Sequence, residues 1–83
     1  MERYKNLAVS ADVLARQIAE ARNAIHKASL EERQAVLNGW VGRIANRVIN
    51  VDKQARILGI QVDRRLNIEN HYRTLANIAR SHK

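Results

Sequence analysis

The sequence predicts an all-α protein. Proline is absent, glycine occurs only at positions 39, 42 and 59, and the apolar residues recur in steps of three and four. Nowhere do they alternate cleanly, as they would in a half-buried strand. The 83 residues suffice for one small domain with a thin core. We therefore expect a single domain over residues 1–83, with a long antiparallel helical hairpin, a shorter third helix and coiled-coil-like packing.

The first helix is predicted over about residues 10–27. Its apolar residues form a stripe that would face a partner helix. Ser10 could cap the start of this helix, which would leave residues 2–9 as a separate turn or a frayed extension. The stripe consists of Tyr4, Leu7, Ala11, Leu14, Ile18, Ala21, Ile25 and Ala28.

A capping box is predicted between the first and second helices. The Ser29 side chain would accept a hydrogen bond from the backbone N–H of Glu32, and the Glu32 side chain would reach back to the Ser29 N–H. This break would fold the two helices into a tight hairpin in which each buries its stripe on the other. The alternative is one unbroken helix through Ser29.

The second helix is predicted from Leu30 to about Leu58. Gly39 and Gly42 lie inside it, and each is less favourable than alanine by about 1 kcal/mol. The helix could kink there, allow a neighbour to approach closely, or be split by a short loop. Trp40 would cover the edge of the core or anchor a partner. The heptad stripe of this helix is Leu37, Val41, Ile44, Val48, Val51, Ala55 and Leu58.

The third helix is predicted over residues 63–80. Gly59 would end the preceding helix with a left-handed cap, Ile60–Val62 would form a linker, and Asp63 would cap the new helix. We interpret Glu69 as a surface acid and residues 81–83 as a disordered tail. The apolar stripe of this helix is Ile68, Tyr72, Leu75 and Ala79, with Ile78 alongside.

The charge of the chain favours a polyanionic partner. Fifteen lysines and arginines against eight acids give a net charge of +7. Eleven of the fifteen cations are arginines, whose planar guanidinium suits phosphate recognition. We therefore expect nucleic acid as the polyanionic partner, and we favour DNA over RNA.

The second helix carries a basic, amide-rich stripe opposite its apolar one. Arginine can reach phosphates and guanine, while asparagine and glutamine can reach adenine. The alternative is an ordinary solvated helix face. The stripe comprises Arg43, Asn46, Arg47, Asn50, Lys53 and Gln54. The predicted nucleic-acid contacts are Arg43, Arg47, Lys53, Arg56, Arg64, Arg65 and Arg73. The predicted partner interface is Trp40, Leu37, Val41, Ile44 and Val48.

Enzyme chemistry is poorly supported. The three histidines show no metal-ligand spacing, and Ser29 lacks the carboxylate and oxyanion turn that a nucleophile needs. The absence of cysteine excludes disulfides and thiolate zinc sites. We expect no catalytic residue, no metal and no cofactor. No apolar run could span a membrane, and the N-terminus lacks a signal-peptide core, so a soluble cytoplasmic protein is expected.

The segment Val48–Ile60 resembles part of some bacteriophage terminase small subunits. In those proteins a long helix ends in an alanine-arginine, leucine-glycine-aliphatic phrase, matched here by Ala55, Arg56, Leu58, Gly59 and Ile60. The resemblance implies a helical, ring-forming protein that recognises viral DNA, in the cytoplasm of a bacterial host.

These observations predict a non-catalytic nucleic-acid-binding protein that forms a homo-oligomer, in a phage or mobile-element setting. The alternative is a protein-interaction module, an adaptor or inhibitor that places an amphipathic helix face on an acidic protein partner.

Overall fold

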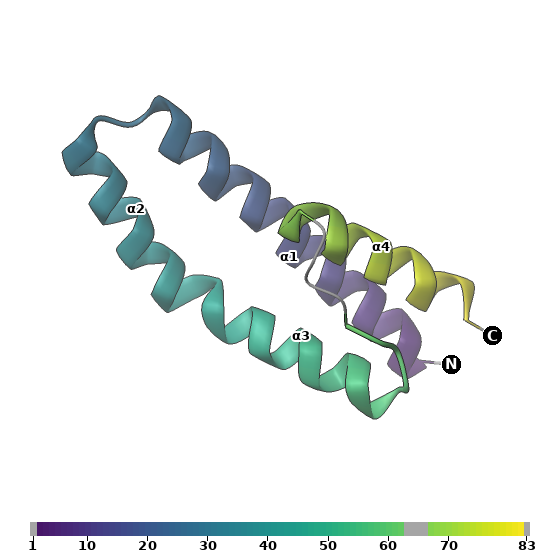
Figure 1. Cartoon of the computed structure of the whole chain (residues 1–83). Helices are drawn as coiled ribbons and strands as arrows, with labels where there is room; N and C mark the ends of the chain where they lie inside the picture. The colour runs from purple at the N-terminus through teal and green to yellow at the C-terminus, as the bar shows by residue number, and fades with distance from the viewer. Residues whose placement is uncertain (1, 63–66, 83) are drawn as a thin grey trace.

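The protein is all-α, as the sequence predicts. The computed structural model describes residues 2–62 and 67–82, and within them lie four helices. These are α1 (Glu2–Lys27), α2 (Leu30–Arg43), α3 (Ala45–Ile57) and α4 (Ile68–Ser81). α2 and α3 follow each other along one arm, which runs antiparallel to α1, while α4 lies along α1 (Figure 1). The molecule is elongated, with extents of 46 × 21 × 18 Å.

The helix α1 is longer than predicted and supplies much of the core. Its predicted stripe is buried from Leu7 to Ile18 and half-buried at Tyr4 and from Ala21 onward. The helix begins at Glu2, so Ser10 is not its cap. Two features stabilise the first turns of α1. Leu7 and Ala8 are buried, and the Tyr4 hydroxyl donates a hydrogen bond of 3.1 Å to the Leu58 carbonyl.

The break at Ser29 is confirmed. Ser29 has extended backbone angles (φ −67°, ψ 168°), and its hydroxyl accepts a 3.3 Å hydrogen bond from the Glu32 N–H. The Arg33 side chain donates to the Ile25 carbonyl at 3.2 Å, which satisfies an acceptor near the end of α1. The chain therefore turns here, and the alternative of one unbroken helix is wrong.

The arm formed by α2 and α3 is interrupted at Ile44 and not at Gly39 or Gly42. Ile44 (φ −101°, ψ −41°) separates α2 from α3, yet backbone hydrogen bonds still join Ile44 to Trp40 and Val48 to Ile44. Gly39 and Gly42 lie within α2, and a Cβ built on either would meet nothing within 4 Å. Neither glycine therefore serves a close approach by a neighbouring element.

The hairpin does not close as tightly as predicted, because the main partner of α1 is α4. These two helices pack far more extensively than α1 does with α2 or α3. No residue of α2 is buried, and Leu37 and Val41 are 48% and 67% exposed. The predicted stripe of this arm is buried only from Ile44 to Ala55, with Leu58 half-buried.

Gly59 ends α3 as predicted. Its φ is +79°, a left-handed conformation that glycine adopts at low cost. The Gly59 N–H bonds the Arg56 carbonyl at 3.0 Å, and the Ile60 N–H bonds the Ala55 carbonyl at 2.8 Å. This pair of bonds is a Schellman motif, and it directs Ile60, which is 8% exposed, into the core.

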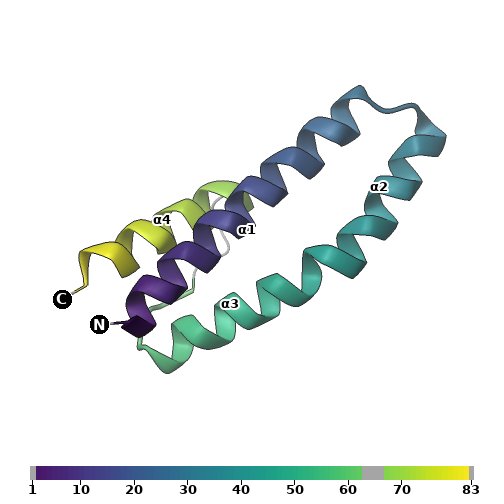
Figure 2. The ribbon, with the colours of Figure 1, turned by 180° about the vertical axis from the view of Figure 1, so that it is seen from behind.

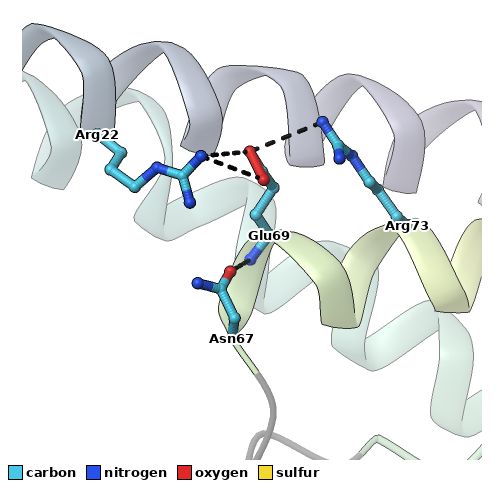
Figure 3. Close-up of polar contacts among 4 residues, drawn as sticks. All are labelled: Arg22, Asn67, Glu69 and Arg73. Atoms are coloured by element: carbon cyan, nitrogen blue, oxygen red, sulfur yellow. Dashed lines mark hydrogen bonds and ion pairs between the residues drawn. The ribbon is translucent and has the colours of Figure 1, made fainter.

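The helix α4 starts later than predicted. Asn67 is non-helical (φ −51°, ψ 130°), and its side chain accepts a 3.0 Å hydrogen bond from the Glu69 N–H, so Asn67 caps a helix that begins at Ile68. The predicted cap, Asp63, lies outside the described residues. Glu69 is 5% exposed, which corrects its interpretation as a surface acid. Its carboxylate contacts Arg22 at 3.3 Å and Arg73 at 3.7 Å (Figure 3).

Three further contacts stabilise the position of α4 and of His82, which follows it. The Tyr72 hydroxyl, fully buried, donates a 2.9 Å hydrogen bond to the Asp52 carboxylate of α3. At the other end, the ring of His82 stacks on that of Tyr4, with centroids 4.1 Å apart, and Arg80 pairs with Asp12. The helix reaches Ser81, so the predicted tail is ordered through His82.

Candidate nucleic-acid interface

A shallow crevice runs between α1 and α3. It consists of two hollows of about 340 and 390 Å³ that share Gln54. No α4 residue lines either hollow, because α4 packs on another side of α1. We call its polar lining the basic crevice: Arg3, Asn6 and Ser10 from α1, and Arg47, Asn50 and Gln54 from α3.

Helical spacing explains why these side chains meet. Arg47, Asn50 and Gln54 are separated by three and four residues and therefore share one side of α3. Arg3, Asn6 and Ser10 repeat the same spacing on α1. Arg43 precedes Arg47 by one turn and lines a third hollow between α1 and α2, together with Glu20. From Arg43 to Gln54 the arm covers about 17 Å at 1.5 Å per residue.

The charged side chains that are described in the lining of the basic crevice are all positive. Among the described residues no acid lines either hollow, and the residues beside the polar ones are Val9, Val13, Val51, Ile57 and Leu58. Arg3, Arg43 and Arg47 are exposed, and within the part of the chain that the structure describes none forms an ion pair. Their guanidinium groups are therefore available to an anion, next to amides that can donate and accept hydrogen bonds.

The structure gathers only some of the predicted nucleic-acid contacts in one place. Arg43 and Arg47 lie along the arm, next to or in the basic crevice. Lys53 and Arg56 are exposed on α3 but line none of its hollows. Arg73 lies on α4 and pairs with Glu69, away from the crevice. Arg64 and Arg65 lie outside the described residues.

The predicted partner interface separates into two parts. Ile44 and Val48 are buried in the core at 5% and 9% exposure, so they offer no surface to a partner. Leu37 and Val41 are exposed on α2. Trp40 is half-buried and packs against the core, as expected for a residue that covers its edge.

Sequence reasoning did not identify the contribution of α1. The sequence predicts a turn, a frayed extension or a cap for the segment that holds Arg3, Asn6 and Ser10, although their spacing of three and four is a helical signal. The burial of Leu7 and Ala8 makes this segment helical and so places the three polar side chains on one face.

The described residues were also compared with the requirements of a metal site and of a membrane-spanning helix. In residues 2–62 and 67–82, no cluster of three or more histidine or carboxylate side chains could hold a metal ion. Across the same residues, no helix has the length and apolar character needed to traverse a bilayer. Comparisons with protein-family models, curated proteins and solved structures find no match, so the resemblance to terminase small subunits stays a prediction.

Proposed function

We propose that this chain is a small, non-catalytic nucleic-acid-binding protein that places its basic crevice against a phosphate backbone. The observation that supports this proposal is a crevice lined by arginines and amides, with no acid among the lining residues that the structure describes. DNA is favoured over RNA, and the phage or mobile-element setting, which rests on the resemblance at Val48–Ile60, is part of the proposal, as is the homo-oligomer.

The segment from Arg43 to Gln54, which covers about 17 Å, is long enough for several contacts to a phosphate backbone. Duplex DNA carries one charge per ~1.7 Å of helix axis, so a length of ~17 Å presents about ten phosphates. One phosphate each can be neutralised by Arg3, Arg43 and Arg47, which form no ion pair with another described residue. The expected slope of log affinity against log salt is then about −2.7 for each protomer that binds.

The test is a fluorescence-anisotropy titration of a labelled DNA duplex at several salt concentrations. Replacing Arg3 or Arg47 with alanine should weaken binding to all sequences and make the slope shallower by about 0.9. Arg16→Ala is the matched control, because Arg16 is exposed on α1 but lines neither hollow.

Two results would contradict this proposal. One is the absence of binding to duplex or single strands at low salt. The other is an equal loss in Arg16→Ala and Arg47→Ala, because general charge rather than the basic crevice would then explain the affinity.

The exposed apolar residues of α2 favour the alternative of a protein-interaction module with an acidic partner. That function predicts that Trp40→Ala affects capture of a partner from lysate more than Arg43→Ala with Arg47→Ala does. It also predicts that nuclease treatment leaves the capture unchanged. A nucleic-acid-dependent capture shows the opposite pattern on both points.

A further inference from the structure

The basic crevice is continuous with the third hollow, which lies between α1 and α2. On the arm, residues that line the hollows follow steps of three and four: Trp40, Arg43, Arg47, Asn50 and Gln54. On α1 the same steps join Asn6, Ser10, Val13, Gln17, Glu20 and Ala24. Residues at such steps share one side of a helix, so the three hollows form one groove between α1 and the arm.

This groove is long, and α4 leaves it free. From Trp40 to Gln54 it covers about 21 Å at 1.5 Å per residue. In both views α4 lies along α1, and no α4 residue that the structure describes lines any of the three hollows (Figures 1 and 2). A chain-like ligand can therefore follow the groove from the basic crevice to α2.

The α2 end of the groove differs in chemistry from the basic crevice. Its hollow, of about 430 Å³, is lined by Trp40 and by the small side chains of Ala21, Ala24 and Ala35. Among the described residues that line it, Arg43 is the only cation and Glu20 the only acid. Because Glu20 repels a phosphate, this hollow suits an uncharged group whose phosphate lies outside it, on Arg43.

A nucleobase is an uncharged group with the properties that this hollow requires. Its flat face stacks on aromatic side chains, and Trp40 is only half-buried, so part of its indole is accessible. The amino group of cytosine donates hydrogen bonds to carboxylates, and the exposed Glu20 supplies one.

Base pairing decides which nucleic acid can use the hollow. In a duplex the bases are stacked and paired, and only their edges reach the grooves. In a single strand they are free to leave the stack, and proteins bind such strands with basic grooves that carry aromatic side chains. Here Trp40 precedes Arg43 by three residues and Arg47 by seven, so an aromatic platform and two cations follow one another along one arm.

We propose that this groove binds single-stranded DNA, with an unpaired base stacked on Trp40. The inference rests on the proposed function, because the same arginines of the basic crevice and Arg43 bind the backbone phosphates. It adds that the affinity depends on the bases as well as on charge.

Tryptophan fluorescence of the unmodified protein reports the stacking contact, because Trp40 is the only tryptophan. Three labelled DNA probes are titrated: a single strand of cytosines and adenines, a strand of equal length made of abasic sites, and the duplex of the first strand with its complement. The base-containing single strand should quench the fluorescence and bind about 5- to 150-fold more tightly than the abasic strand, as measured by anisotropy. The abasic strand and the duplex should bind in a salt-dependent manner and leave the fluorescence unchanged.

Two variants separate stacking from general charge. Trp40→Leu should abolish the advantage of the base-containing strand over the abasic one, whereas Trp40→Phe, which keeps an aromatic ring, should retain most of it. The affinity for the abasic strand should be the same in both variants and is the control, together with helicity measured by circular dichroism.

The outcomes distinguish this inference from the proposed function. Equal affinities for the base-containing and abasic strands, or fluorescence that the base-containing strand leaves unchanged, overturn the stacking contact and leave phosphate binding intact. Quenching by the duplex as strong as that by the single strand overturns it too, because no unpaired base is then needed. If no probe binds at low salt, the proposed function fails and this inference fails with it.

Discussion

Replacing Tyr72 with phenylalanine tests a buried hydrogen bond between α4 and α3. The hydroxyl lies 2.9 Å from the Asp52 carboxylate, and the two residues are 0% and 4% exposed. The substitution keeps the ring and removes only the donor. A hydrogen bond to a charged group contributes about 1.5–3 kcal/mol, so the free energy of unfolding should fall by about that amount.

The expected shift in Tm follows from the length of the chain. With about 2.1 cal/mol/K of unfolding entropy per residue, 83 residues give about 0.17 kcal/mol/K, so Tm should fall by about 9–17 °C. Circular dichroism followed through heat and urea unfolding measures both quantities. Tyr4→Phe is the control, because the Tyr4 hydroxyl bonds a neutral carbonyl at a half-buried site and should contribute only about 0.5–1.5 kcal/mol.

A double-mutant cycle with Asp52→Ala, which removes the acceptor, isolates the pair. The double variant should be more stable than the sum of the two single losses predicts, because both substitutions remove the same interaction. Additive losses, or a Tyr72→Phe effect no larger than that of Tyr4→Phe, would refute the reasoning that this hydrogen bond stabilises the packing of α4.

Four further substitutions can be measured by the same urea unfolding. Gly39→Ala and Gly42→Ala should each add about 1 kcal/mol, because an added Cβ meets nothing within 4 Å; a loss would reveal an unseen contact. Gly59→Ala should instead remove about 1–2 kcal/mol, since its φ is +79°. Arg22→Ala should remove about 1 kcal/mol by weakening the pairing of buried Glu69, and an unchanged midpoint would contradict this.

Local features of the structure could be predicted because their causes are local. Ser29 ends one helix and starts another through a side-chain hydrogen bond to a residue three positions on. Gly59 ends α3 because it can adopt a positive φ, and the bonds that it allows are all within five residues. The apolar stripe of α1 was equally visible, because burial of a helix face requires only the correct spacing.

Features that depend on contacts between residues far apart in the sequence could not be predicted. The sequence predicts a surface position for Glu69, and its buried pairing with Arg22 could not be foreseen because the two residues are 47 positions apart. The start of α1 at Glu2 depends on Tyr4 meeting Leu58, and the order of His82 depends on the same tyrosine ring. Similarly, the basic crevice joins Arg3 and Asn6 to Gln54 across two helices, and only half of it could be predicted from one helix.

The sequence by itself determined that this chain is helical, where it turns at Ser29 and Gly59, and which faces are apolar or basic, because spacing and capping act within a few residues. Only the tertiary structure decided which faces meet. A heptad stripe shows that one face of a helix must be buried, but it does not determine which helix buries that face. The helix α1 could have packed mainly on α2, and it packs mainly on α4 instead. Because of this packing, Leu37 and Val41 of α2 stay exposed, and the basic crevice lies on the side of α1 that α4 does not cover.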